Sequence, residues 1–388
     1  MSARLRVLYS VEGFTDIRFV AGLSEIADLT MLVARRPYEE SGLKARVAAA
    51  GLKLRVVEVG GGRLRYQAAS LAPLWRLARE ADVVLAQEVL RGALNANLVG
   101  LARRVPVVTY LGVSPLEYFR CREARGRLGP VRARVGEAAI RTLMTVNGRL
   151  ATRCLAMGSY LRDVAAAYCP RTAIGLYYGV DTGTFRPAEP AERLELRRRR
   201  DLPEDRFLVF LSSRISHEKD PETVLRATAL ARRRGLDAVL LNLGGGYAEF
   251  LALARGMGLG DVDRWVMGRP AAHPVTEVAD YFRAADVMAL ASLAEGAAFS
   301  TLEALACGTP VVATAVGGMA TELPGYARLV PRRDAEAMAE QLLWVASHGE
   351  EARAQALRGR AHVTRAWSRE KAFADLLAVL EEVAREGR

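Results

Sequence analysis

Residues 295–315 have the sequence EGAAFSTLEALACGTPVVATA, and this stretch decides the fold class. Glu295 and Glu303 are separated by seven residues, and Gly308 and Pro310 precede an apolar run that begins at Val311. A helix that ends at a glycine and continues through a proline into a short apolar strand is typical of a doubly wound sheet. Ligands bind such sheets where strand ends meet helix N-termini, so two carboxylates here indicate a candidate active site.

The same alternation of short strands and helices extends outward in both directions. In the second half we expect strands at residues 207–212, 238–243, 264–267, 286–291 and 311–315, and in the first half at 5–9, 29–34, 54–59, 82–87, 105–111 and 153–157. Nearly continuous apolar strands joined by helices indicate parallel sheets that are covered on both faces. The sequence therefore predicts an α/β protein with two tandem Rossmann-like, doubly wound domains and a cleft between them.

A chain of 388 residues exceeds one ordinary hydrophobic core, which also favours two domains. After Asp181 the pattern loosens into Pro187, Pro190 and a charged run at 193–200, where we place the boundary. We assign residues 1–180 to the first domain and 181–355 to the second. Residues 356–388 are expected to form a C-terminal helix that crosses back to the first domain.

The composition excludes several classes of protein. Hydrophobic residues make up 51% of the chain and charged residues 26%, which indicates a globular protein, and no apolar run reaches the about 18 residues that a membrane span needs. The four cysteines form no CxxC pair, so we expect a reduced, cytoplasmic compartment and no metal site.

The positive charge is concentrated in the first half. The net charge is +11, and residues 1–180 hold 27 Lys and Arg against 14 Asp and Glu. Within residues 118–153 nine arginines stand against two glutamates. The segment from Arg120 to Arg153 could contact anionic membrane lipid at the inner face of the cell membrane, or it could be a solvated surface. We do not expect a nucleic-acid partner, because aromatic stacking positions and recognition motifs are missing.

One lysine has an unusual position. The chain has 51 arginines and only four lysines, and between residues 54 and 370 the single lysine is Lys219, just after an expected strand. A lysine retained among so many arginines suggests a need for a compact ammonium group, which could bind a diphosphate together with Arg214. The alternative is a surface ion pair between Glu218 and Lys219.

The helix that contains Glu303 also has two interpretations. Ser300 and Glu303 have the spacing of a capping box, in which Glu303 would bond back to its own helix start. The free N–H groups of a helix N-terminus also favour an anion, and the small residues at 296–298 would let a ligand approach that backbone. Capping does not explain Glu295, which lies before the helix.

These motifs together resemble the large retaining glycosyltransferase family 4, the glycosyltransferases group 1, which have the GT-B fold. The matching residues are Tyr178 to Asp181, Phe185 to Pro187, Arg214 with Glu218 and Lys219, Glu295 and Glu303 with the run to Thr314, and Gly317 with Gly318. The motifs occur in family-like order over residues 175–320, whereas the first half is similar only in its architecture.

The resemblance implies that the second domain holds a nucleotide-diphosphate-sugar donor and that the first domain lies on the acceptor side. Arg214 and Lys219 would neutralise the diphosphate, and Glu295 would bind the sugar hydroxyls. Glu303 would bind the ribose, and the donor would also contact Ser300, Thr301 and Leu302 through their N–H groups, as well as Phe299 and Gly13. It further implies transfer with retention, no metal or other cofactor, and an acceptor sugar that is lipid-linked or a small molecule.

Two alternatives remain at this point. A nucleotide-sugar epimerase or a sugar phosphorylase could share the fold, and release of sugar with phosphate would identify the latter. A non-catalytic protein could use the basic first half to bind a membrane or nucleic acid.

Overall fold

The structure is a computed structural model that describes residues 4–60, 63–124, 129–244, 246–269 and 273–386. The chain divides into two compact units. The first comprises Met1–Phe119, Gly126–Gly179 and Glu370–Arg388, and the second comprises Arg120–Arg125 and Val180–Arg369. We expected the C-terminal helix of residues 356–388 to cross back to the first domain. In the structure residues 356–369 belong to the second unit, and the chain belongs to the first unit from residue 370 onward.

The first unit contains a seven-stranded parallel sheet in the order β3-β2-β1-β4-β5-β6-β7. Its strands are β1 (Arg6–Val11), β2 (Asp28–Ala34), β3 (Arg55–Val59), β4 (Val83–Ala86), β5 (Val107–Leu111), β6 (Arg153–Met157) and β7 (Thr172–Gly175). The helices that follow its strands are α1 (Ile17–Ile26), α2 (Arg35–Glu40), α3 (Leu43–Ala49), α4 (Arg63–Leu77) with η1 (Ala78–Glu80), α5 (Arg91–Arg103), α6 (Pro115–Glu123), α7 (Pro130–Leu150) and α8 (Gly158–Ala166).

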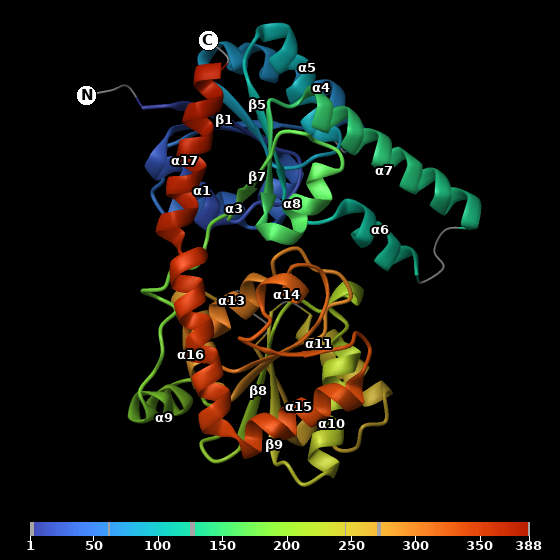
Figure 1. Ribbon diagram of the computed structural model, residues 1–388, viewed down its shortest axis with the longest axis vertical. Coiled ribbons are helices and arrows are strands. Elements are labelled where there is room, and N and C mark those ends of the chain that lie inside the picture. Colours follow the sequence, from blue (N-terminus) through green and yellow to red (C-terminus); the bar gives the residue numbers. More distant parts are fainter. Residues whose placement is uncertain (1–3, 61–62, 125–128, 245, 270–272, 387–388) are drawn as a thin grey trace. The chain divides into compact units, whose positions relative to one another are not determined.

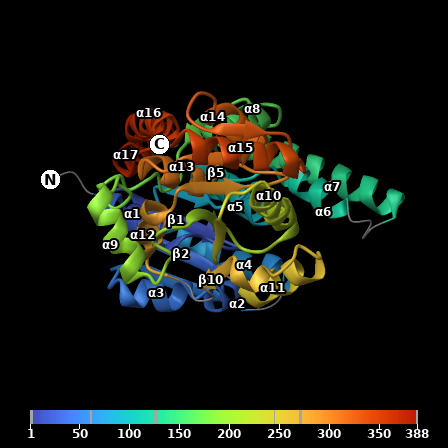
Figure 2. The same cartoon turned by 90° about the horizontal axis from the view of Figure 1, so that it is seen from below.

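The second unit contains a six-stranded parallel sheet in the order β10-β9-β8-β11-β12-β13. Its strands are β8 (Phe207–Ser212), β9 (Ala238–Leu243), β10 (Val266–Arg269), β11 (Val287–Leu290), β12 (Val311–Thr314) and β13 (Arg328–Val330). Its helices are α9 (Pro190–Arg199), η2 (His217–Lys219), α10 (Pro221–Arg233), α11 (Tyr247–Gly256), η3 (Val262–Arg264), α12 (Val275–Ala284), α13 (Phe299–Ala306), α14 (Gly317–Glu322), α15 (Ala335–Ser347) and α16 (Gly349–Ala366). Helices α10 and α15 pack side by side (Figures 1 and 2).

These two sheets confirm the predicted fold class, and the expected strands lie within a few residues of the observed ones. Two strands, β7 and β13, were not predicted. They are four and three residues long, and they stand at the edges of their sheets, so their sequences carry little of the apolar signal that marks buried central strands.

The final helix, α17 (Arg369–Glu386), belongs to the first unit. Figure 1 shows it beside α1, and a Cβ at Gly22 of α1 would lie 2.0 Å from the ring of Phe373. Glycine is therefore required at position 22 so that α17 can approach α1 closely. Ion pairs also hold α17 in the first unit, because Arg153 pairs with Glu382 at 2.9 Å and with Glu386 at 3.0 Å.

The basic segment predicted at residues 120–153 is only partly a basic surface. Its described residues lie mostly in α6 and α7, and residues 125–128 lie outside the described residues. Arg153 is ion-paired with α17, so it does not contribute to a free basic face. The exposed arginines of α7 are Arg132, Arg134, Arg141 and Arg149.

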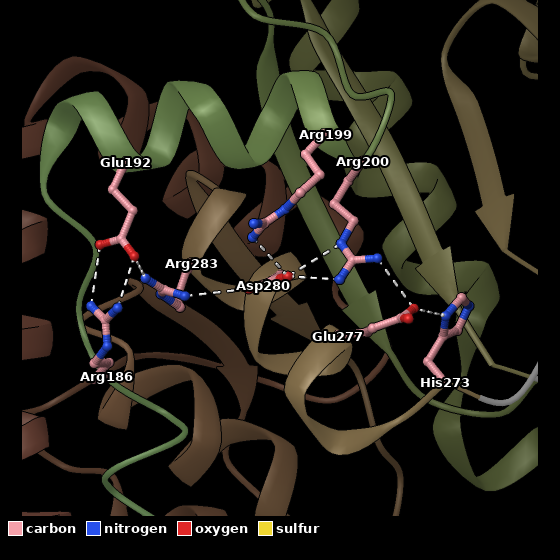
Figure 3. Close-up of polar contacts among 8 residues, drawn as sticks. All are labelled: Arg186, Glu192, Arg199, Arg200, His273, Glu277, Asp280 and Arg283. Atoms are coloured by element: carbon pink, nitrogen blue, oxygen red, sulfur yellow. Dashed lines mark hydrogen bonds and ion pairs between the residues drawn. The ribbon is translucent and has the colours of Figure 1, made fainter.

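A network of charged side chains joins α9 to α12 (Figure 3). Glu192 pairs with Arg186 at 2.9 Å and also with Arg283. Asp280 accepts a hydrogen bond from Arg200 at 2.7 Å and lies 3.3 Å from Arg283. The charged run that marked the expected domain boundary is therefore largely a helix held to the second unit by ion pairs.

Candidate functional site

The candidate site is built at the point where the strand order of the second sheet reverses. Strand β8 lies between β9 and β11, and the chain passes from β8 outward to β9 and β10 before it returns to β11 and β12. The carboxyl ends of β8 and β11 are neighbours because the two strands are parallel and paired. Such a reversal is where open α/β sheets bind their ligands.

The loop after β8 is anchored to the adjacent strand and to the loop after β11. The buried amide of Asn242 donates to the carbonyl oxygens of Leu211 at 3.2 Å and Ser213 at 3.1 Å. The N–H of Leu293 donates to the carbonyl oxygen of Glu218 at 2.8 Å. These bonds fix the backbone of the loop that carries Arg214 and Lys219.

Each cation of this loop is paired with a carboxylate. Arg214 donates to Glu218 at 2.6 Å, and its side chain is 62% exposed, whereas the Glu218 side chain is 8% exposed. Lys219 pairs with Glu295, and Ser292 donates to the same Glu295 oxygen at 3.0 Å. The structure thus brings Lys219 to Glu295 and Arg214 to Glu218, and the Arg214 side chain is the most accessible of these four.

The Lys219–Glu295 pair is largely shielded from water. The Lys219 side chain is 20% exposed and that of Glu295 is 13% exposed. The sequence singled out both residues but not their contact, and it missed Ser292 and Asn242. The only sequence signal for these two residues is a polar side chain at or just after the end of an apolar strand. Asn242, near the end of the apolar run 238–243, is an example.

Two glycines of α14 allow a third loop to join the site. A Cβ at Gly317 would lie 1.9 Å from the carbonyl oxygen of Glu295, and one at Gly318 would lie 1.9 Å from that of Gly296. The hydroxyl of Thr314 donates to the carbonyl oxygen of Ser292 at 2.6 Å. The backbones of the loops after β11 and β12 are therefore in direct contact, which only glycine permits at positions 317 and 318.

The capping-box interpretation, one of the two offered for Glu303, is wrong. Helix α13 begins at Phe299 with Ala298 as its N-cap and has no side-chain cap, so Ser300 is already its second residue. The backbone of Ala298 has a positive φ of 20°, and its carbonyl oxygen accepts bonds at 2.8 Å from both the N–H and the hydroxyl of Thr301. The turn at Ala298 therefore starts the helix earlier than the Ser300 spacing suggested.

The expected donor-binding residues of α13 differ in how they could meet a ligand. Phe299 and Ser300 are partly exposed at the start of the helix. Thr301 and Leu302 are each 1% exposed, and the Thr301 N–H already donates to the carbonyl oxygen of Ala298, so neither residue offers a ligand much surface in this structure. Glu303 is 6% exposed and lies inside the helix, away from its cap.

The remaining predicted residue, Gly13, lies in the first unit just after β1. A Cβ at this position would have nothing within 4 Å, and its φ is not positive. Neither packing nor backbone conformation requires glycine there, so its expected contact with the donor stays a prediction.

Two further observations concern cofactors and membranes. Within the part of the chain that the structure describes, no three His, Cys, Asp or Glu residues are grouped so that they could hold a metal ion. Among these same residues, no helix has both the length and the apolar character needed to cross a bilayer.

Sequence comparison relates much of the chain to known proteins. Residues 192–362 match the family described as glycosyl transferases group 1. D-inositol 3-phosphate glycosyltransferase 1 of Catenulispora acidiphila is 32% identical over 64% of this chain and 60% of its own length. The D-inositol 3-phosphate glycosyltransferase of Kineococcus radiotolerans is 41% identical over 37% of this chain and 34% of its own length. The chain therefore spans less than two thirds of either relative.

Comparison with solved structures confirms the GT-B fold over nearly the whole chain. Anabaena HepE in complex with UDP-glucose has a TM-score of 0.77 at 16% identity, with 97% of this chain and 100% of that one covered. WaaG, a glycosyltransferase involved in lipopolysaccharide biosynthesis, has a TM-score of 0.70 at 15% identity, with 96% and 99% covered. At these identities the likeness concerns the fold.

Proposed function

We propose that this chain, whose residues 192–362 match the group 1 glycosyltransferases, transfers a sugar from a nucleotide-diphosphate sugar to a hydroxyl of an acceptor. The observation that carries this proposal is the ion pair of Lys219 with Glu295, which joins the loops that follow the paired strands β8 and β11. The family and the named relatives do not favour the epimerase, phosphorylase or non-catalytic alternatives.

The cations of the loop after β8 bind the diphosphate of the donor. Arg214 is exposed and Lys219 is held in place by Glu295, so both are positioned before the donor arrives. Positive charge that is fixed in advance stabilises the negative charge that develops on a departing diphosphate. The N–H of Ser300, a partly exposed residue at the positive end of α13, adds to this stabilisation.

The two glutamates bind donor hydroxyls. When the diphosphate attracts Lys219, Glu295 regains the capacity to accept hydrogen bonds from the transferred sugar. Glu303, which the structure does not use as a helix cap, accepts bonds from the ribose. Buried carboxylates bind hydroxyls strongly, because charge-assisted hydrogen bonds are roughly twice as strong as neutral ones.

The reaction proceeds with retention and without a metal. The bond between the anomeric carbon and the diphosphate oxygen breaks, and the acceptor oxygen attacks the same face and forms the new glycosidic bond. The acceptor proton passes to the departing diphosphate, so the charges balance. Arg214 and Lys219 provide the positive charge that a divalent cation would otherwise supply.

The acceptor is a sugar, lipid-linked or small. Both relatives named above carry D-inositol 3-phosphate in their names, which makes a phosphorylated cyclitol one acceptor to test. Helix α7 exposes Val131 and Val135 (70% and 64%) close to Arg132 and Arg134, a combination that suits the surface of an anionic membrane. We place the protein in the cytoplasm, at the inner face of the membrane when the acceptor is a lipid.

A thermal-shift screen against UDP-, GDP-, ADP- and CDP-sugars in excess EDTA tests the donor proposal. At least one sugar nucleotide should raise Tm in the wild type and fail to do so in Lys219→Ala. If none raises Tm, with or without added Mg²⁺, the donor site is wrong. If Mg²⁺ is required, only the metal-independent mechanism is wrong.

A further inference from the structure

The tryptophan that follows α16 contacts two helices of the candidate donor site. Trp367 is the C-cap of α16 and is 2% exposed. Its ring centre lies 6.0 Å from that of Phe299, the first residue of α13, in an edge-to-face arrangement. Its indole N–H donates to the carboxylate of Glu322, the last residue of α14, at 3.3 Å. One buried side chain thus contacts the start of α13 and the end of α14.

These two helices hold the loop that carries Glu295. The loop runs directly into α13, so the position of Phe299 sets one end of it. At the other side, Gly317 and Gly318 place the start of α14 against the backbone of the loop, and the Gly318 N–H donates to the Glu295 carbonyl oxygen at 3.3 Å. A displacement of either helix would therefore move Glu295 and change its contact with Lys219.

The backbone that carries Trp367 is itself fixed. Its carbonyl oxygen accepts a hydrogen bond from the Val180 N–H at 2.7 Å, and the Arg369 N–H donates to the Val180 carbonyl oxygen at 2.9 Å. Val180 and Ser368 consequently form a parallel bridge. A buried aromatic ring on a paired stretch of backbone has little freedom to move, which is what a supporting residue requires.

We propose that Trp367 and Glu322 are positioning residues of the donor site. The Trp367 ring supports the start of α13, and the bond from its indole to Glu322 holds α14 against the loop of Glu295. The proposal rests on the proposed function, in which α13 and that loop bind the sugar nucleotide. Support of this kind matters because ligand-binding groups must be held within about 0.5 Å of their working positions.

His362 determines the pH at which the test is made. Its Nε2 lies 3.9 Å from the Glu322 oxygen that accepts the indole bond, and its ring stacks on Tyr326. Burial lowers the pKa of His362 below its usual value of 6.5, Glu322 opposes that change, and Arg365 adds to it. At pH 8 the imidazole is therefore neutral, and loss of the indole bond is measured without a charged pair between His362 and Glu322.

Two variants remove the indole–carboxylate bond from opposite sides. Trp367→Phe keeps an aromatic ring beside Phe299 but has no N–H, and Glu322→Leu removes the acceptor. In both variants of the full chain, without ligand, amide hydrogen exchange of residues 295–303 should become about 3- to 10-fold faster, as expected when one hydrogen bond no longer opposes local opening. Glu322→Gln keeps an oxygen that accepts from the indole, so its exchange should stay within about 2-fold of the wild type.

Donor affinity is measured on the same proteins by calorimetric titration at pH 8 with UDP-glucose, GDP-mannose and ADP-glucose, with and without Mg²⁺. For the probe that binds the wild type most tightly, Kd should rise about 3- to 30-fold in Trp367→Phe and Glu322→Leu, the range for residues that act on a site without touching its ligand. Glu322→Gln should restore binding to within about 2-fold of the wild type, because the indole keeps an acceptor.

The matched control is Trp265→Phe. Trp265 is 3% exposed and belongs to the same unit, but it immediately precedes β10 and so lies at the amino end of the sheet, whereas the donor site lies at the carboxyl ends. This substitution should lower Tm, as Trp367→Phe does, and should leave both donor affinity and the exchange of residues 295–303 unchanged.

Unchanged exchange of residues 295–303 in Trp367→Phe and Glu322→Leu would overturn the proposal. Faster exchange with unchanged donor affinity would overturn it too, as would a Glu322→Gln variant that behaves like Glu322→Leu or a Trp265→Phe variant with equal losses. If no sugar nucleotide binds the wild type, the proposed function fails and these residues have no donor to position. The exchange of residues 295–303 then still decides whether Trp367 and Glu322 hold the loop.

Discussion

The ammonium group of Lys219 donates a hydrogen bond to the carboxylate of Glu295, although 76 residues separate the two along the chain. The pair joins the loop after β8 to the loop after β11, so the cation expected to meet the diphosphate and the carboxylate expected to meet the sugar hold each other in place. In the proposed function, donor binding replaces the contact of Lys219 with Glu295 by contacts of Lys219 with the diphosphate and of Glu295 with the sugar hydroxyls.

Lys219→Ala should lower both stability and donor binding. Loss of the ammonium leaves the largely buried Glu295 carboxylate without its cation, which should cost about 1–3 kcal/mol of unfolding free energy. Donor affinity should fall at least about 10-fold, because a hydrogen bond to a charged group contributes about 1.5–3 kcal/mol. Calorimetric titration and denaturant unfolding measure the two effects. Lys371→Ala, which removes an exposed lysine of α17 that pairs with Asp375, should change neither. Unchanged donor affinity in Lys219→Ala would remove Lys219 from the site.

Glu303→Gln should weaken donor binding about 10-fold and leave Tm within about 2 °C of the wild type. The amide keeps the size of the side chain, and no helix cap is lost, because α13 does not use Glu303 as one. Donor affinity and Tm are compared with those of Glu340→Gln, an exposed residue of α15. A large fall in Tm together with normal donor affinity would show that Glu303 is a structural residue.

Gly318→Ala should destabilise the second unit by about 1–3 kcal/mol and weaken donor binding, because the added methyl group collides with the Gly296 carbonyl oxygen and displaces the loop that carries Glu295. Denaturant unfolding and donor titration test this. In Gly256→Ala, at the exposed end of α11, a Cβ meets nothing within 4 Å, and stability should stay the same or rise by up to about 1 kcal/mol. Equal stability of the two variants would contradict the close backbone approach.

The Glu192 ion pairs should make stability depend on acid pH. The hydrogen bonds from Arg186, and then from Arg283, lower the pKa of Glu192 to about 2 from 4.5. A lowered pKa stabilises the fold above the unfolded value, so this contribution is complete above about pH 5 and is lost as pH falls from 4.5 toward 2. The unfolding free energies of wild type and Glu192→Gln should therefore differ most near pH 6 and converge near pH 2. A difference that stays constant with pH would argue against these pairs.

If α7 contacts lipid, vesicle binding should require anionic lipid and weaken as salt is added. Arg132→Ala combined with Arg134→Ala should lower the partition coefficient roughly 30-fold, since each basic residue near an anionic surface contributes about 1 kcal/mol. Co-sedimentation with vesicles that contain or lack phosphatidylglycerol measures it. Arg162→Ala removes an exposed arginine that pairs with Asp163 on α8 and is the control. Equal binding to neutral vesicles would leave α7 as a solvated helix.

Much of the fold could be predicted because it is encoded locally. The apolar runs at 207–212 and 238–243 coincide with β8 and β9, since a central parallel strand must be apolar on both faces. Gly308 was recognisable as a helix end because glycine readily adopts the positive φ that ends many helices, and its φ after α13 is +68°. The short edge strands β7 and β13 lack that local signal.

The sequence by itself determined which side chains could carry chemistry: an almost solitary lysine, an arginine near it, and two glutamates at a fixed spacing. Only the tertiary structure decided their partners. The contact of Lys219 with Glu295 and the close approach of Gly318 to Gly296 both depend on which strands are neighbours in a sheet. Neighbours there are chosen by packing of the whole domain, whereas propensity and spacing act only within a few residues of the chain.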